Sequence, residues 1–442
     1  MKPYPRYNQS SARWYSSFPE TWSEVKAKRL FSNERERACS EDEQLAASQK
    51  YGVIPQTLMM AQNNAKVMLA LKGTDNFKQV KEDDFVISLR SFEGGIEHSR
   101  YSGCISPAYT VLRLRYESSY PNYFRYALKC SPFIQALNST SEGIRDGKTI
   151  TYDEFGELFL TLPSQAEQKS IATFLDREIQ RIDSLIEEKQ NFIKLLKEKR
   201  QALISHVVTK GLNLNVEMQD SGIEWIGQVP KHWVVKKIKY DVLGIEQGWS
   251  PQCESTPVPD DQTWGVVKVG CVNRGIFNPE QNKKLPEELE PKKEHTIKKG
   301  DLLVSRANAK EWVGSAAVPD RDYNNLLLCD KIYRIRLDLE KADPEFFAYY
   351  LASGQAREQI EIDATGTSSS MLNIGQGTIL NMPIPVPELP EQQSIVQGLK
   401  NKTSQIDRLV LEVLGSIELL KEHRTSLISA AVTGKIDVRE AV

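Results

Sequence analysis

The sequence predicts an α+β protein built twice from one plan, a mixed α/β domain followed by a long helix. We expect the two helices to be antiparallel and coiled-coil-like, with a pseudo-two-fold relation between the halves. The first observation is that residues 163–211 recur without a gap as residues 387–435. The second is that the motif FPETW, which ends at Trp22, returns as VPKHW, which ends at Trp233. A self-match at half of the chain length indicates a duplicated two-part protein rather than a solenoid.

The duplication predicts four segments. They are a first mixed domain at 1–161, a first helical region at 162–212, a second mixed domain at 213–385 and a second helical region at 386–442.

The composition is typical of a soluble globular protein, with 40% hydrophobic and 26% charged residues. No apolar run approaches the roughly 20 residues of a membrane helix, and the N-terminus lacks the apolar region of a secretory signal. Six scattered cysteines without a CxxC pair favour reduced thiols. We therefore expect a cytoplasmic protein without membrane contact. The net charge of −2 does not favour nucleic acid, but local patches decide such contacts.

Each mixed domain contains an acidic turn before an apolar run, VKEDDFVISLR in one half and IKKGDLLVSR in the other. This pattern predicts a turn that leads into a β-strand, with Asp84 and Asp301 as turn residues. The loops that follow, SFEGGIEHSRYSG and ANAKEWVGS, differ completely from each other. The duplicated frame therefore carries different loops at matching places.

The rest of each half also matches. Strands are predicted at 106–115 and 326–337, short helices at 121–130 and 344–353, and final strands at 157–163 and 380–387. Polar loops, STSEGIRDGKTI and ATGTSSSMLNIGQG, precede the final strands.

Each long helix is expected to begin near a proline, Pro163 or Pro387, and to end at a glycine, Gly211 or Gly434. Apolar side chains at steps of three and four place one stripe on each helix. The predicted packing residues are Leu175, Ile179, Ile182, Ile186, Ile193, Leu196, Leu203, Leu399, Ile406, Val410, Val413, Ile417, Leu420 and Leu427. A helix this exposed is marginal alone, so we expect the two stripes to pack together. The alternative is a helix pair buried within one compact domain.

Motifs for self-contained chemistry are absent from the sequence. There is no P-loop, no GxGxxG, no GxSxG and no HExxH, and the five histidines lie far apart. We expect no catalytic residue and no metal site.

The chain resembles the DNA-specificity subunit of type I restriction-modification enzymes. The residues that carry the resemblance are the repeated LPSQAEQKSIATFLDREIQRID and LPEQQSIVQGLKNKTSQID, then LLKEKRQALISHVVTKG and LLKEHRTSLISAAVTGK. The linker SGIEWIGQVPKHWVVKKIK and the stretch GTSSSMLNIGQG are also of this kind. The resemblance covers essentially the whole chain.

This resemblance implies that each mixed domain is a target-recognition domain that reads one half of a split, asymmetric DNA site. The helices would set the gap between the half-sites and dock two methyltransferase subunits, which bring S-adenosylmethionine. Restriction subunits with ATP- and Mg-dependent translocase and nuclease activity would join them. The chain itself would bind double-stranded DNA and no cofactor, and would catalyse nothing.

Phosphate contacts position a DNA-binding protein, and base-edge contacts specify the sequence. The base-reading candidates are polar, basic and aromatic loop residues: Arg90, His98, Arg100, Tyr101, Arg145, Lys148, Arg306, Asn308, Lys310, Trp312, Thr367, Ser368 and Ser369. The phosphate candidates are the basic residues after each entry motif: Lys26, Lys28, Arg29, Lys236, Lys237 and Lys239.

Two other functions stay open at this point. One is a coiled-coil scaffold whose globular domains bind proteins, and the other is a nuclease that carries its own DNA reader. Different loops on a common frame favour the specificity subunit over the scaffold.

Overall fold

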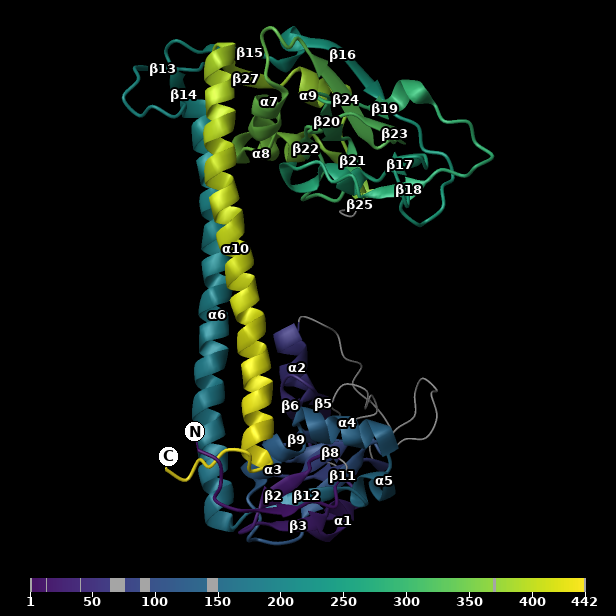
Figure 1. Cartoon of the computed structure of the whole chain (residues 1–442), viewed down its shortest axis with the longest axis vertical. Helices are drawn as coiled ribbons and strands as arrows, with labels where there is room; N and C mark the ends of the chain where they lie inside the picture. The colour runs from purple at the N-terminus through teal and green to yellow at the C-terminus, as the bar shows by residue number, and fades with distance from the viewer. Residues whose placement is uncertain are drawn as a thin grey trace. The chain divides into compact units, whose positions relative to one another are not determined.

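The computed structural model describes residues 2–12, 14–39, 41–63, 76–87, 96–140, 150–368 and 371–440. The chain forms two compact units (Figure 1). Unit 1 comprises Met1–Lys189 and Leu414–Val442, and unit 2 comprises Gln190–Val413. Each unit contains one mixed domain and one end of both long helices.

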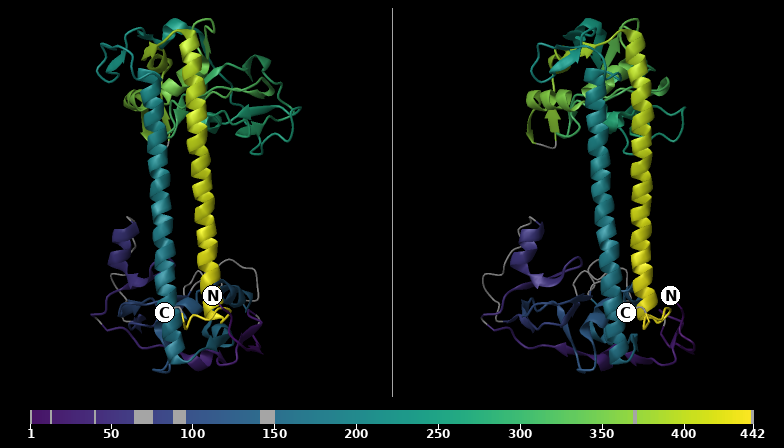
Figure 2. Two further views of the ribbon diagram at one scale, coloured as in Figure 1. Left: turned by 60° about the vertical axis from the view of Figure 1, so that its left-hand side comes forward. Right: turned by 90° about the vertical axis from the view of Figure 1, so that its left-hand side faces the viewer.

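The two long helices are α6 (Gln165–Lys210, 46 residues) and α10 (Leu389–Val432, 44 residues) (Figures 1 and 2). Each begins two residues after the proline that predicted its start. The glycines that predicted their ends, Gly211 and Gly434, adopt positive φ angles of 75° and 70°. Glycine tolerates this left-handed conformation at the end of a helix.

Both units pack α6 against α10. In unit 1, Leu175 from the early turns of α6 shares a core with Leu427 from the late turns of α10. In unit 2, Ile204 from the late turns of α6 shares a core with Leu399 from the early turns of α10. The helices are therefore antiparallel, and the predicted fold class is confirmed.

The side chains predicted to pack between the helices are buried or half-buried. The buried ones are Leu175, Ile179, Ile182, Ile193, Leu196, Leu399, Ile406, Ile417 and Leu427. The half-buried ones are Ile186, Leu203, Val410, Val413 and Leu420.

The mixed domain of unit 1 is a set of small antiparallel sheets. A four-stranded sheet has the order β4 (Phe31–Glu34), β11 (Thr110–Leu114), β8 (Phe85–Ile87) and β9 (Ile96–His98). Two-stranded sheets pair β12 (Phe159–Leu162) with β3 (Ser23–Lys26), β10 (Gly103–Ile105) with β7 (Lys78–Val80), β5 (Leu45–Ser48) with β6 (Gly52–Pro55), and β1 (Tyr7–Gln9) with β2 (Ser17–Pro19). The helices are α1 (Ala27–Leu30), α2 (Gln56–Asn63), α3 (Pro121–Ala127), α4 (Ser131–Thr140) and α5 (Tyr152–Gly156). Pairing of β12 with β3 joins the end of the domain to its beginning, and the chain then enters α6.

Unit 2 repeats this frame and adds to it. The corresponding sheet has the order β16 (Val242–Gln247), β24 (Ile332–Leu337), β20 (Leu302–Ser305) and β22 (Ala316–Ala317). Smaller sheets pair β15 (Val234–Lys237) with β27 (Pro383–Val386), and β13 (Met218–Asp220) with β14 (Gln228–Pro230). The helices are α7 (Pro344–Leu351), α8 (Gly354–Asp363) and α9 (Gln376–Leu380), with 3-10 turns η3 (Ile238–Asp241), η4 (Val269–Gly275) and η5 (Lys293–His295).

A second sheet of unit 2 encloses its own core. Its order is β18 (Asn282–Lys284), β17 (Gly265–Val267), β23 (Tyr323–Leu327) and β19 (Thr296–Ile297), with β17 parallel to β23. The sequence did not predict this sheet.

The acidic turns are stabilised in the same way in both units. Asp84 accepts a hydrogen bond from the backbone N–H of Lys81 (2.7 Å), and its two oxygens accept from Arg113 (2.7 Å each). Asp301 accepts from the backbone N–H of Lys298 (2.9 Å) and lies 3.7 Å from buried Arg334. Both aspartates are turn residues, as the sequence predicted.

Three segments that were predicted as loops contain strands. β9 lies in the segment 91–103, β21 (Ala307–Asn308) lies in the segment 307–315, and the hairpin of β25 (Thr365–Ser368) and β26 (Met371–Asn373) lies in the segment 364–377. These strands have only two to four residues, so the alternation that signals a strand is missing.

No helix in the described part of the chain is long and apolar enough to cross a membrane. All six cysteines are free thiols.

Candidate nucleic-acid interface

The base-reading candidates of the second half meet at one small sheet of unit 2. Strand β21 (Ala307–Asn308) pairs with β26, and β26 pairs with β25. Asn308 lies opposite Leu372, and Ser368 lies opposite Met371. Two segments separated by more than fifty residues therefore form one small sheet.

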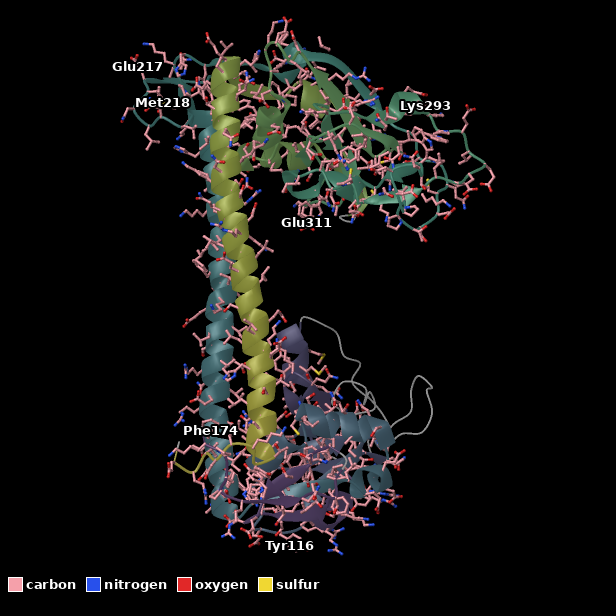
Figure 3. The ribbon with its side chains drawn as sticks, viewed as in Figure 1. Tyr116, Phe174, Glu217, Met218, Lys293 and Glu311 are labelled. Atoms are coloured by element: carbon pink, nitrogen blue, oxygen red, sulfur yellow. The ribbon has the colours of Figure 1, made fainter. Side chains whose placement is uncertain are left out.

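A tight turn follows β21 and carries the most accessible candidates. The backbone N–H groups of Trp312 and Val313 donate to the carbonyl of Ala309 at 2.8 and 2.9 Å. Lys310 and Glu311 are exposed, and Trp312 is half-buried. Figure 3 shows Glu311 at the outer edge of unit 2. We call residues 309–313 the reading turn.

Two candidates just before the reading turn are buried or half-buried. Asn308 is buried; its Oδ1 accepts from the N–H of Ala309 (2.9 Å), and its Nδ2 donates to Asn273 (3.1 Å). The guanidinium of half-buried Arg306 lies 5.9 Å from the ring centroid of Tyr333. The side-chain amide of Asn308 is thus engaged inside the protein, whereas the buried Nε of Arg306 has no hydrogen-bond partner among the described residues.

The remaining candidates of this half belong to the hairpin. Thr367 and Ser368 lie in β25, and Ser369 lies outside the described residues.

In unit 1, His98 is buried and is therefore not the exposed loop residue that the sequence predicted. Its Nε2 lies 2.9 Å from Oδ1 of Asp83, and its ring packs 5.0 Å from that of Phe85. Burial lowers the pKa of His98, and hydrogen bonding to Asp83 opposes this shift. His98 is buried because residues 96–98 form strand β9, in which all three residues are buried.

Arg100 and Tyr101 follow β9 in a turn, and both are exposed. Arg90, Arg145 and Lys148 lie outside the described residues. The exposed base-reading candidates in the described part of unit 1 thus lie in the turn between β9 and β10.

Two phosphate candidates of unit 1 are held by one carboxylate. Lys26 donates to Glu157 at 2.6 Å, and Lys28 forms an ion pair with the other oxygen of Glu157. Hydrogen bonds from Lys26 and then Lys28 lower the pKa of Glu157 to about 2. These lysines are partly neutralised, whereas Arg29 is exposed.

The same pattern holds in unit 2. Lys236 donates to buried Asp241 at 2.6 Å, so its charge is compensated within the protein. Lys237 and Lys239 are exposed, and the ammonium of Lys239 lies 5.6 Å from the ring centroid of Tyr240. Lys28 is exposed but paired with Glu157, so Arg29, Lys237 and Lys239 are the exposed phosphate candidates outside these ion pairs.

The sequence analysis missed the residues that fix each domain on the helices. In unit 1, Tyr4 donates to Glu167 of α6 at 2.6 Å. In unit 2, Glu391 of α10 accepts from Trp233 at 3.2 Å and lies 2.9 Å from Nε2 of His232. The signal was present, because Glu167 and Glu391 are matching positions of the repeat.

Some apolar side chains of the helices are not covered. Leu195 is 61% exposed in unit 2, and Leu419, at the matching position of the repeat, is 67% exposed in unit 1. An exposed leucine therefore occurs at the same position in both copies of the repeat.

Among the described residues, no group of three or more His, Cys, Asp or Glu side chains is placed to hold a metal ion.

The family comparison agrees with this arrangement. The family model described as type I restriction modification DNA specificity domain matches residues 19–195 and again residues 230–413. The chain belongs to the type I restriction modification DNA specificity family. The two matches fall on the two halves of the duplication, and each extends from a mixed domain into a long helix.

Relatives in the specificity family are distant. The specificity subunit of the type I restriction enzyme EcoEI from Escherichia coli is 27% identical over 41% of this chain and 31% of its own length. That of EcoKI from Escherichia coli strain K12 is 24% identical over 72% of this chain and 66% of its own length. That of MjaVIII from Methanocaldococcus jannaschii is 24% identical over 81% of this chain and 80% of its own length. The chain thus aligns with about a third of the first relative and two thirds of the second.

Two solved structures share the fold. A chain from a study of complex assembly and conformational transition of the type I R-M system has a TM-score of 0.69 and 14% identity, covering 95% of this chain and 99% of that one. The HsdS subunit from Thermoanaerobacter tengcongensis has a TM-score of 0.54 and 16% identity, covering 96% and 99%.

Proposed function

We propose that the chain is the DNA-specificity subunit of a type I restriction-modification complex. Each mixed domain is a target-recognition domain that reads one half of a bipartite, asymmetric DNA site. The chain is a non-catalytic subunit of a cytoplasmic complex. Its segments are the domains at 1–161 and 213–385 and the helical regions at 162–212 and 386–442.

The observation that carries this proposal is a repeated frame with different surfaces on it. Unit 1 and unit 2 share a turn whose buried aspartate pairs with an arginine, but the loops that follow differ in length and chemistry. The common frame attaches both domains to the helices in the same way, and the different loops read two different DNA half-sites.

Sequence reading is assigned to the exposed loop groups. In unit 2 these are exposed Lys310 and Glu311 and half-buried Trp312 of the reading turn, together with the candidates Thr367, Ser368 and Ser369. A lysine donates to guanine O6 and N7, and a glutamate accepts from cytosine N4 in the major groove. In unit 1 they are Arg100 and Tyr101, together with the candidates Arg90, Arg145 and Lys148. Arg29, Lys237 and Lys239 are assigned to phosphates.

The helices set the gap between the two DNA half-sites and bind the partner subunits. Two copies of a methyltransferase subunit, which brings S-adenosylmethionine, bind the helices, one through the surface around Leu195 and one through that around Leu419. Restriction subunits supply ATP- and Mg-dependent translocation and cleavage. The near-neutral charge of the chain supports a division in which partner subunits provide part of the attraction to DNA.

Footprinting of the chain with its co-purified partner subunits tests the proposal. We expect two protected half-sites separated by an unprotected gap. A scaffold would give no footprint, and metal-dependent cleavage by the chain alone would indicate a nuclease; either result would overturn the proposal.

A further inference from the structure

An arginine of α8 lies directly behind the reading turn. The side chain of Arg357 is 17% exposed, and its guanidinium points at the backbone of the turn. It donates to the carbonyl of Lys310 at 3.3 Å, to that of Glu311 at 3.2 Å, and to that of Val313. One side chain therefore binds three of the five carbonyls of the turn.

Helix α8 also packs closely against the end of the turn. Gly314 has a φ angle of 74°, and a Cβ built there would lie 2.6 Å from Cγ2 of Ile360. Glu361, one turn after Arg357, lies 3.7 Å from the guanidinium and 3.8 Å from Nζ of Lys310. The turn is thus fixed on its buried side by α8, while the side chains of residues 310 and 311 remain in solvent.

The guanidinium has the geometry for this task. It is planar, carries five N–H donors at fixed directions and stays protonated, so it can bind several carbonyls at once. A lysine has one rotating ammonium group and cannot reproduce this pattern.

The contact between Arg357 and the reading turn occurs in the second domain only, as the repeat shows. The helices α3 and α7 match in sequence from Pro121 and Pro344, and continuing that match without a gap pairs Arg357 with Ile134. The arginine is therefore not part of the shared frame. It belongs to the part of the chain that differs between the two domains, as the reading turn does.

We infer that Arg357 is a positioning residue for DNA reading by the second domain. Its guanidinium holds the backbone of residues 310–313 in one conformation before DNA binds, so that Lys310, Glu311 and Trp312 meet base edges in a fixed geometry. This inference rests on the proposed function. A turn that is ordered in advance loses less conformational entropy on binding, and discrimination between bases depends on side chains held within about half an ångström.

Binding measurements on the full chain in its complex with partner subunits test the inference. Once the target has been found by sequencing of methylated bases, each half-site receives single base-pair substitutions. The discrimination ratio is the affinity for the target divided by that for the substituted DNA. The variants are Arg357→Lys and Arg357→Gln, and Glu358→Gln, an exposed position on the same helix, is the matched control.

We expect Arg357→Lys to lower the discrimination ratio about tenfold in one half-site and to leave the other half-site unchanged. The melting temperature should stay close to that of the unaltered chain, while amide hydrogen exchange at residues 310–313 should become faster. Equal loss in both half-sites with a lower melting temperature would show a merely structural role and overturn the inference.

Lys310→Ala and Trp312→Ala separate this inference from the proposed function. If they lower discrimination in one half-site and Arg357→Lys does not, the reading turn stands and the positioning role is wrong. If neither they nor Arg357→Lys changes discrimination, the turn reads no bases and the inference falls, whereas a bipartite footprint would still support the specificity subunit.

Discussion

Asp183 of α6 and Arg424 of α10 form an ion pair in unit 1, with 2.9 Å between Oδ1 and Nε. Unit 2 contains the same pair with the helices exchanged, because Arg200 of α6 lies 3.0 Å from Asp407 of α10. Arg200 follows Asp183 by 17 residues, and Asp407 precedes Arg424 by 17 residues. One antiparallel register therefore holds in both units. The duplication itself explains this, since each copy supplies one acid and one base.

Removal of the ion pair in unit 1 should cost little stability. Both side chains are partly exposed, so we expect a coupling of about 0.2–1 kcal/mol between Asp183 and Arg424. A double-mutant cycle with Asp183→Ala and Arg424→Ala in urea denaturation measures it. The matched cycle at Arg200 and Asp407 should give a similar value, and a coupling near zero in one unit alone would contradict the equivalence.

Truncation of the helix core should cost far more. Leu175 is fully buried in the core of unit 1, so Leu175→Ala should lower the free energy of unfolding by about 2–5 kcal/mol. Leu195→Ala is the matched control on the same helix, and its effect should be small because the side chain is exposed. Equal effects in the two variants would show that the helix faces are assigned wrongly.

Exposed leucines should matter for assembly instead of stability. We expect Leu195→Asp to weaken binding of one methyltransferase subunit and Leu419→Asp to weaken binding of the other. Native mass spectrometry of the complex should show loss of one subunit in each single variant and of both in the double variant. Full assembly of the double variant would exclude this surface as the docking site.

The ion pairs of Glu157 predict a pH dependence. Its folded pKa of about 2 lies below the unfolded value of about 4.3, so ionised Glu157 stabilises the folded state above pH 4.3. This contribution is lost as the pH falls from about 4.3 toward 2. The difference in unfolding free energy between the chain and Glu157→Gln should therefore be smaller at pH 3 than at pH 7. A larger difference at pH 3 would mean that Lys26 and Lys28 do not stabilise the carboxylate.

The long helices could be predicted from the sequence because their signals are local. Apolar spacing, a proline before each start and a glycine after each end lie within or beside the elements that they define. The repeat also predicted that the two helices pack together, because their apolar stripes match in position and length. Helices α6 and α10 begin two residues after Pro163 and Pro387, and they end one residue before Gly211 and two residues before Gly434.

The parts that could not be predicted depend on contacts between distant residues. Strands β17 and β23 pair in parallel across more than fifty residues, and no local pattern announces this. His98 was assigned to an open loop, although its bond to Asp83 and its contact with Phe85 place it in a core. The role of Arg357 could not be predicted, because an arginine in a polar helix is expected to be solvated. Only the folded chain brings it against the reading turn, about forty-five residues earlier in the sequence.

The central claim is that the two domains read two half-sites and that the helices set the gap between them. Insertion of seven residues after Ile193 in α6 and after Val413 in α10 keeps the register of both ion pairs. Sequencing of methylated bases in cells that carry the unaltered and the lengthened chain measures the outcome directly. We expect the same two half-sites with a changed gap. Unchanged spacing, or half-sites that change in sequence, would contradict the account.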